Sequence, residues 1–252
     1  MAQELNPVII IPARLASTRL PQKPLADIHG KPMVVHVLTH ALEADIGPVI
    51  VATESDEIAS VVTKAGGRAI LTGDHHETGT DRMYEAVTLA DPNKNHDIVI
   101  NLQGDLPSLS GKAIRAVMDP IHHDAKVDIA TLVNLAKSAE EWLSPSNVKA
   151  ALEYKEGDKV ARALYFSREL IPAKVGDPTY PYFHHIGIYA YRRAALEAFV
   201  KLPMSRLEVS EKLEQLRALA AGMRIDAAFV NEAPVSVDTA HDLEQARAQM
   251  AN

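Results

Sequence analysis

Short apolar runs alternate with amphipathic segments along the first half of the chain, and this alternation limits the fold more than any other feature. The runs have strand length and several β-branched residues, at residues 8–11, 49–52, 68–71 and 97–101. Segments with helical spacing or capping signals separate them, at residues 32–42, 55–66 and 81–90. Strands that are separated by helices pair in parallel and need cover on both faces. The pattern therefore predicts an α/β fold with a parallel central sheet.

The second half of the chain has a different pattern, in which long helices are scarce. A helix is expected over residues 110–121, and short strands follow it at residues 128–134, 148–154, 162–166 and 187–191. The remaining elements are a helix, a strand and a helix, over residues 207–221, 225–230 and 239–250. We interpret the middle region as a more antiparallel extension, of the kind that supplies a lid or a dimer surface. No repeat or linker divides the chain, so we expect a single domain over residues 1–252.

The composition is that of an ordinary globular protein that binds no nucleic acid. Hydrophobic residues make up 47% of the chain and charged residues 23%, unlike a disordered protein. The net charge of −7 argues against an extended basic surface for nucleic acid but leaves room for a local anion site. No apolar stretch is long enough to span a membrane. The sequence has no cysteine and opens without a basic leader, so we expect a cytoplasmic location and no membrane partner.

A basic, proline-bounded loop follows the first predicted strand. Arg14, Ser17, Arg19 and Lys23 lie in it, and no Asp or Glu occurs between residues 5 and 26. In open α/β sheets, ligands bind beyond the carboxyl ends of the strands, which is where this loop begins. Arginine forks and a lysine ammonium suit phosphate oxygens, so the loop predicts a triphosphate site. The alternative is a solvated loop whose charges pair with carboxylates from elsewhere in the chain.

Two common nucleotide-binding motifs are absent from the sequence. Gly30-Lys31 and Gly111-Lys112 are not followed by Ser or Thr, and no G-x-G-x-x-G follows a predicted strand. We therefore expect neither a P-loop ATPase nor a dinucleotide oxidoreductase.

Two aspartates are candidate ligands for a magnesium ion. Asp105 follows the fourth predicted strand in the segment Asn101–Pro107, where Gly104 lets the chain turn. Asp238 ends the run Val235–Asp238, just before the final predicted helix. Mg²⁺ takes oxygen ligands and is usually held by one or two carboxylates beside substrate phosphates. The alternatives are an Asp105 that only forms a turn and an Asp238 that caps the last helix.

Three pairs of adjacent histidines suggest zinc at first sight: His75-His76, His122-His123 and His184-His185. Neighbouring side chains on a strand point to opposite sides, so such pairs rarely share one metal, and we expect no zinc at them. His185 is of interest for another reason, because a strand would place it on the same side as Tyr189, where both polar tips would line a pocket. The alternative is a half-buried strand whose polar side faces solvent.

Seven segments are distinctive when they are taken together and in order. They are P-A-R-L-A-S-T-R-L-P-Q-K-P-L, G-T-D-R, N-L-Q-G-D-L-P, A-L-Y-F-S-R, H-H-I-G-I-Y-A-Y, E-K-L-E-Q-L-R-A-L and V-D-T-A-H-D-L. Together they resemble the 3-deoxy-manno-octulosonate cytidylyltransferases, or CMP-Kdo synthetases, over nearly the whole chain. The resemblance implies a Rossmann-like nucleotide-diphospho-sugar transferase fold. It also implies a homodimer built through the antiparallel region, roughly residues 135–205.

The resemblance assigns a role to each candidate site residue. The triphosphate of CTP would be held by Arg14, Ser17, Arg19 and Lys23. Cytosine recognition would involve Gly79, Thr80 and Arg82. The sugar acid would contact Gln103, Arg168, His185, Tyr189, Glu214 and Gln215, with Arg168 as the partner of its carboxylate. A Mg²⁺ cofactor would be bound by Asp105 and Asp238.

The activity that the resemblance implies is the transfer of CMP from CTP to 3-deoxy-D-manno-octulosonate (Kdo), for lipopolysaccharide synthesis. The anomeric hydroxyl would attack the α-phosphorus in line and expel pyrophosphate, with Lys23, Asp105 and Arg19 as the residues that act in catalysis. Alternatives are a cytidylyltransferase for 8-amino-Kdo or another keto-sugar acid, a sugar-1-phosphate nucleotidylyltransferase, and a catalytically silent nucleotide-binding protein.

Two positions depart from the family pattern. Leu106 stands where many relatives have Glu, which leaves Asp105 with more of the charge near the metal. Ser236 stands where a glycine is expected before Val237-Asp238. We expect neither change to abolish activity.

Overall fold

The computed structural model describes residues 5–17, 19–136, 138, 142–173 and 179–251 of the chain. The chain divides into two compact units, one made of residues 1–115 with 233–252 and the other of residues 116–232. The first unit is therefore built from both ends of the chain. The single domain predicted over residues 1–252 stays a prediction, because compactness does not measure whether either unit folds without the other.

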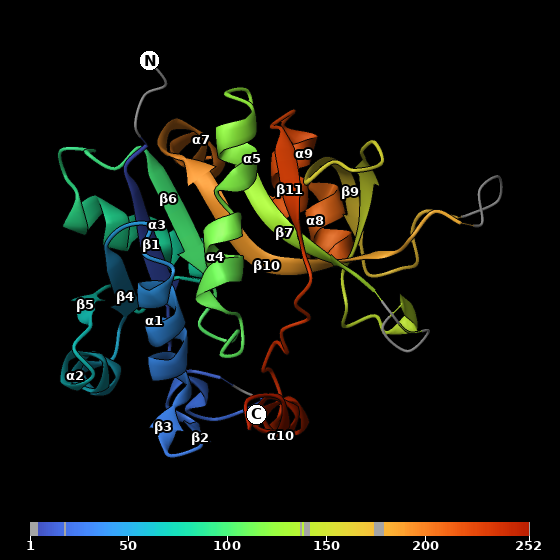
Figure 1. Ribbon diagram of the computed structural model, residues 1–252. Helices are drawn as coiled ribbons and strands as arrows, with labels where there is room; N and C mark the ends of the chain where they lie inside the picture. The colour runs from blue at the N-terminus through green and yellow to red at the C-terminus, as the bar shows by residue number, and fades with distance from the viewer. Residues whose placement is uncertain (1–4, 18, 137, 139–141, 174–178, 252) are drawn as a thin grey trace. The chain divides into compact units, whose positions relative to one another are not determined.

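The sheet of the first unit consists of parallel strands in the order β5-β4-β1-β6 (Figure 1). The strands are β1 (Pro7–Pro12), β4 (Val49–Thr53), β5 (Arg68–Leu71) and β6 (Ile98–Leu102). Residues 8–11 and all of β4 and β6 are buried, which explains their uninterrupted apolar character. The parallel sheet predicted for the first half of the chain is confirmed.

The helices that connect these strands are α1 (Met33–Glu43), α2 (Asp56–Lys64) and α3 (Gly79–Ala90). The chain moves from β1 through β4 to β5 and then returns past β1 to β6. Because such crossovers are right-handed, α1 and α2 cover one face and α3 covers the other, and α1 and α2 contact each other. The carboxyl ends of β1 and β6 therefore flank a switch point, the place where open α/β sheets bind ligands.

The C-terminal segment packs against the loop that follows β1. Its helix is α10 (Ala240–Gln249), and the loop contains a 3₁₀ turn, η1 (Lys23–Leu25), and the short strands β2 (Asp27–Ile28) and β3 (Lys31–Pro32). A buried apolar cluster joins the two segments through Ile28, Met33, Val237, Leu243 and Ala246. The backbone N–H of Val237 also donates to the carbonyl oxygen of Asp105, at 2.9 Å. These contacts fix the residue after Val237 beside the loops at the ends of β1 and β6.

The second unit has a sheet with the strand order β10-β7-β11-β9-β8 and a further pairing between β8 and β10. Its strands are β7 (Ile129–Leu135), β8 (Lys149–Glu153), β9 (Val160–Ser167), β10 (Phe183–Arg192) and β11 (Ile225–Val230). The pair β7–β11 is parallel, and the pairs β7–β10, β9–β11, β8–β9 and β8–β10 are antiparallel. The more antiparallel character predicted for this region is confirmed.

Two predicted helices are each split in the structure. The first becomes α4 (Gly111–Ala116) and α5 (Asp119–His123), because Pro120 in the first turn of α5 has no N–H to continue a helix. The second becomes α8 (Arg206–Glu211) and α9 (Gln215–Ala220), because Lys212 adopts a left-handed conformation with φ 54°. Helix α7 (Arg193–Phe199) was not predicted and follows β10 directly.

Within the described residues, the structure contains no helix that is both long and apolar enough to cross a membrane. Of the predicted dimerisation region, residues 137, 139–141 and 174–178 lie outside the described residues. The homodimer stays a prediction.

Replacement of Val237 by Ala should destabilise the first unit. The Val237 side chain is fully buried in the apolar cluster, and the loss of two methyl-sized groups should lower the free energy of unfolding by about 2 kcal/mol. Urea unfolding of the whole protein measures this change. The matched control is Val209→Ala on α8, where the side chain is exposed and the change should stay within about 0.5 kcal/mol. Equal effects of the two substitutions would contradict the packing described for the C-terminal segment.

Candidate active site

A cavity of about 660 Å³ lies in the first unit at the carboxyl ends of β1 and β6. It is lined by the loop after β1, the start of α3, the segment after β6 and the residue before α10. The predicted site residues that line it are Arg14, Ser17, Arg19, Lys23, Gly79, Arg82, Gln103, Asp105 and Asp238. The fold thus brings together candidates that four separate segments of the sequence supply.

The ammonium group of Lys23 lies between two carboxylates in this cavity. Its Nζ donates to Oδ2 of Asp105 at 2.9 Å and to Oδ1 of Asp238 at 3.0 Å. Burial alone would lower the pKa of Lys23, but the two carboxylates outweigh it and hold that pKa above its ordinary value. The charged ammonium therefore joins three segments that are far apart in the sequence.

Asp238 is directed to the cavity because its neighbour caps the last helix. The side chain of Thr239 accepts from the backbone N–H of Asp242, and the Asp242 carboxylate accepts from the N–H of Thr239, which together form a capping box. The alternative that Asp238 caps this helix is therefore excluded. Its Oδ2 lies 3.3 Å from Nη2 of Arg19, so the carboxylate faces two cations of the basic loop.

Gly104 brings Asp105 into the cavity through a close approach of two backbone segments. A Cβ atom at this position would lie 2.9 Å from the carbonyl oxygen of Pro12. β1 and β6 are paired neighbours, so the chain that leaves β6 passes directly beside the end of β1. The residue is not among those with positive φ. Glycine is needed here because a side chain would clash with the neighbouring backbone, and not because of a positive φ.

The basic loop presents a mixture of paired and unpaired cations. Lys23 and Arg19 pair with the two aspartates, as the solvated-loop alternative expects, although the Lys23 side chain is only 18% exposed. Arg14 is exposed and makes no ion pair with any described residue. The Arg19 side chain is 66% exposed. The two guanidinium groups therefore remain accessible to an anion that enters the cavity.

Arg82 and Thr80 are both buried, and of the two Arg82 lines the cavity. Arg82 is 3% exposed, and its Nη1 donates to Oγ1 of Thr72 at 2.7 Å and lies 2.9 Å from Oε2 of Glu54. Glu54 also accepts from the backbone N–H of Leu15 at 2.9 Å, which ties the basic loop to α3. Thr80 is buried and lies outside the cavity lining. Their predicted part in cytosine recognition stays a prediction.

In the second unit, His185 lies buried on β10 beside Thr131 of β7. A bulge in the β7–β10 pairing lets the Thr131 hydroxyl approach the carbonyl oxygens of Ile186 and Ile188, at 3.2 and 2.8 Å. These carbonyls can only accept, so the single hydroxyl proton goes to them and the hydroxyl oxygen accepts from Nε2 of His185, 2.9 Å away. Burial lowers the pKa of His185 to about 3, and His184 adds to the shift. The ring is therefore neutral, with its proton on Nε2.

Three further predicted residues lie in the second unit, Tyr189 on β10 and Glu214 and Gln215 at the start of α9. The ring of Tyr189 is 5.5 Å from that of His185, which confirms that both lie on one side of β10. Burial raises the pKa of Tyr189 well above its ordinary value, and Glu214 adds to the shift. Gln215 is 6% exposed, and its Nε2 has no hydrogen-bond partner among the described residues. Because a buried unpaired amide costs free energy, a polar ligand group there would be stabilising.

Arg168 follows β9, and backbone carbonyls hold its guanidinium. Its Nε donates to the carbonyl oxygen of Glu211 at 2.9 Å, and its Nη1 donates to that of Pro145 at 3.0 Å. These bonds use part of the five-donor fork. The role of Arg168 as partner of a sugar carboxylate stays a prediction.

Comparisons with known proteins agree on the family. A family profile described as cytidylyltransferase matches residues 8–225. A 3-deoxy-manno-octulosonate cytidylyltransferase from Rhodospirillum centenum is 56% identical over 96% of this chain and 93% of its own length. The protein of the same name from Paramagnetospirillum magneticum is 51% identical, over 97% and 98%. The chain belongs to the 3-deoxy-manno-octulosonate cytidylyltransferase family.

Solved structures extend this result to the fold. A CMP:2-keto-3-deoxy-manno-octonic acid synthetase complexed with CTP is 40% identical to this cytidylyltransferase, with a TM-score of 0.87 and 98% of both chains covered. A 4-diphosphocytidyl-2C-methyl-D-erythritol synthase from Anaerococcus prevotii, 12% identical with a TM-score of 0.63, covers 98% of this chain and 99% of its own, and so shares the fold. The protein is a nucleotidyltransferase with the α/β fold that the sequence predicts.

Sequence analysis missed three residues at or beside the cavity of this cytidylyltransferase. His76 and Thr78 line the cavity, and Glu54 braces it from the end of β4. The segment Thr78–Asp81 carries the capping-box pattern, and in the structure the Thr78 hydroxyl accepts from the N–H of Asp81 at 3.1 Å. A capping signal at Thr78 and an acid two residues after the strand predicted at residues 49–52 were thus available in the sequence.

The unfolding free energy should report the neutral His185. An ordinary histidine has a pKa near 6.5, whereas the pKa of His185 in the folded chain is about 3. Between these values the unfolded chain takes up a proton that the folded chain does not, so stability falls as the pH is lowered. The slope that this residue adds is up to about 1.4 kcal/mol per pH unit.

Urea unfolding at a series of pH values from 7 to 4 measures this slope, and His185→Gln should make it shallower. The matched control is His122→Gln, which replaces an exposed ring on α5 and should keep the slope of the unsubstituted protein. Parallel profiles for the unsubstituted protein and His185→Gln would contradict the neutral ring.

Proposed function

We propose that the protein activates Kdo with CTP and releases CMP-Kdo and pyrophosphate, as a step of lipopolysaccharide synthesis. The observation that carries this proposal is the cavity in which Asp105 and Asp238 converge on Lys23 beside the exposed Arg14 and Arg19. Membership of the family gives the reaction and the substrates, because its relatives bear the name of this activity. A structure of a related synthetase complexed with CTP supports the nucleotide.

The basic loop and the start of α3 are suited to bind the triphosphate. Arg14 and Arg19 offer planar donor forks for phosphate oxygens, and Lys23 offers a compact charge. Gly79 begins the twelve-residue helix α3 and lines the same cavity. The free N–H groups and the dipole at a helix N-terminus favour an anion. Together these groups would hold CTP and stabilise the negative charge that develops on the departing pyrophosphate.

Asp105 and Asp238 fit a magnesium ion by their chemistry. Both are carboxylates, and one oxygen of each lies about one hydrogen-bond length from a single cation, the Lys23 ammonium. Mg²⁺ prefers oxygen ligands of this kind and commonly shares them with phosphates. When bound, the ion would neutralise phosphate charge and lower the pKa of the attacking hydroxyl. Lys23 would then be drawn toward the phosphates.

The reaction is a single displacement at the α-phosphorus of CTP. The anomeric oxygen of Kdo forms a bond to this phosphorus, the bond to the bridging oxygen of the β-phosphate breaks, and the hydroxyl proton passes to solvent water. No group of the protein needs to form a covalent intermediate. Correct positioning of the two substrates and stabilisation of the leaving charge by Arg14, Arg19 and Lys23 would supply most of the rate.

We retain the six predicted sugar contacts within this proposal. Gln103 lines the cavity of the first unit. In the second unit, the neutral His185, the neighbouring Tyr189 and the unpaired amide of Gln215 offer donors and acceptors that suit hydroxyl groups. A cytoplasmic location and a homodimer also belong to the proposal, on the basis of the sequence analysis.

Pyrophosphate release from CTP with Mg²⁺, measured with Kdo and without it, tests the function. Release only in the presence of Kdo is expected. If no pyrophosphate is released with Kdo but it is released with 8-amino-Kdo or another keto-sugar acid, the proposal that Kdo is the substrate is overturned.

Asp105→Asn should keep the fold and lose turnover, since one of the two carboxylates for the ion is gone. The matched control is Asp45→Asn, at an exposed site with φ 49° that Asn tolerates, and it should keep full activity.

Replacement of Lys23 by Met should slow the reaction strongly. A preorganised donor at a developing charge is worth roughly 2 to 4 kcal/mol, so kcat/KM should fall by about 30- to 900-fold. Steady-state pyrophosphate release measures this change, and thermal unfolding checks that the variant is folded. Lys31→Met, at an exposed lysine on β3, is the control and should act like the unsubstituted enzyme. A less than threefold effect of Lys23→Met would remove this residue from the proposed mechanism.

A further inference from the structure

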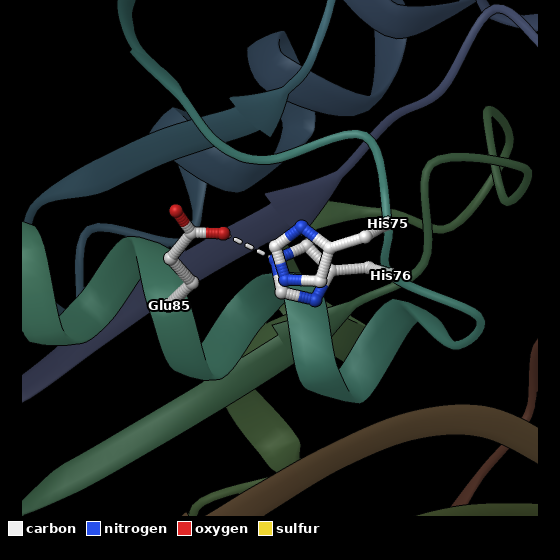
Figure 2. A group of neighbouring side chains, drawn as sticks. All are labelled: His75, His76 and Glu85. Atoms are coloured by element: carbon white, nitrogen blue, oxygen red, sulfur yellow. Dashed lines mark hydrogen bonds and ion pairs between the residues drawn. The ribbon is translucent and has the colours of Figure 1, made fainter.

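We propose that His75, His76 and Glu85 form a second metal site, for a divalent transition-metal ion such as Zn²⁺. The site does not depend on the proposed function. Within the described residues, these three side chains are the group of histidine and carboxylate ligands that meets the spacing for one ion, with one potential ligand atom of each lying within 4.8 Å of the others. Figure 2 shows the two imidazole rings side by side on the loop before α3 and Glu85 facing them from that helix.

The loop conformation makes it possible for two adjacent histidines to serve one ion. The expectation that no histidine pair binds zinc rested on strand geometry, in which neighbouring side chains diverge. His75 and His76 lie on an irregular segment between β5 and α3. Their ring centroids are 4.3 Å apart, with planes inclined by 39°. The two rings therefore lie close together, so the strand geometry behind that expectation does not apply to this pair.

The carboxylate of Glu85 is already held in place for such a site. Its Oε2 accepts from the backbone N–H of Gly73 at 3.0 Å and forms a hydrogen bond with Nε2 of His76. A tetrahedral Zn²⁺ with bonds of about 2.0 Å separates its ligand atoms by roughly 3.3 Å. Small side-chain rotations would bring the three ligand atoms from their present spacing to this value. The ion would then replace the proton between Glu85 and His76.

Gly73 gives the His75 ring its place beside the other two ligands. A Cβ atom on Gly73 would lie 2.4 Å from both Nδ1 and Cε1 of this ring. A side chain at this position would require the His75 ring to move from its present place. The same residue donates its N–H to Glu85. Gly73 is therefore in contact with two of the three ligands.

The choice of ligands separates this site from the magnesium site proposed above. Two imidazole nitrogens and one carboxylate suit Zn²⁺ and similar ions, whereas Mg²⁺ prefers oxygen alone. Three protein ligands also leave a fourth position for water or another group. The His75 side chain is exposed and that of His76 is 10% exposed, so an ion can enter from solvent. His76 also lines the cavity, and a bound ion would hold its ring toward Glu85.

Calorimetric titration of the full, tag-free chain with Zn²⁺ tests this site. The titration is done with a large excess of Mg²⁺, so that Asp105 and Asp238 bind Mg²⁺ and do not bind the added Zn²⁺. One Zn²⁺ per chain is expected. His75→Ala should weaken binding by at least about tenfold, and Glu85→Gln, which keeps an acceptor for Gly73, should do the same. Co²⁺ in place of Zn²⁺ should give the visible absorption of a four-coordinate site, and His75→Ala should abolish it.

Two controls separate loss of ligands from other effects. His122→Ala removes an exposed member of another adjacent pair and should leave Zn²⁺ affinity unchanged. Gly73→Ala keeps all three ligands but displaces the His75 ring, and it should weaken binding. Thermal unfolding without metal shows that each variant is folded. The proposal is overturned if the unsubstituted chain binds no stoichiometric Zn²⁺, or if His75→Ala binds it as tightly.

Discussion

The contact of one ammonium group with two carboxylates organises the first unit. Lys23, Asp105 and Asp238 come from the loop after β1, the segment after β6 and the C-terminal segment, and Lys23 would carry an unpaired, largely buried charge without the two aspartates. Such charges are costly unless they are paired. The apolar cluster around Val237 and the hydrogen bond from Val237 to Asp105 bring the carboxylates to the lysine. Core packing and the electrostatics of the cavity thus support each other.

Much of this arrangement was predictable from the sequence, because its signals are local. Uninterrupted apolar runs marked the buried strands of the first unit, and β11 was placed at its observed bounds. The position of the basic loop after the first strand located the cavity, since parallel strands direct their carboxyl ends to one edge of a sheet. Asp105 and Asp238 were identified as a pair from chemistry and family resemblance, and both line the cavity.

The remainder depended on interactions that no local pattern contains. The partnership of Lys23 with both aspartates spans up to 215 positions, and the buried Arg82 on α3 pairs with Glu54, which follows β4. Single residues divided two predicted helices, since Lys212 adopts a left-handed conformation that its sequence does not announce. The geometry of His75 and His76 follows from an irregular loop, for which periodicity gives no guide.

The first unit is completed by the last residues of the chain, and this has a consequence for synthesis on the ribosome. Domains generally fold as units while the chain emerges from its N-terminus. The sheet strands β1, β4, β5 and β6 are made before Val237, which fills the apolar cluster, and Asp238, the second partner of Lys23. A nascent chain therefore carries its basic loop with one counter-charge missing, and the complete cavity exists only after translation has reached the C-terminal segment.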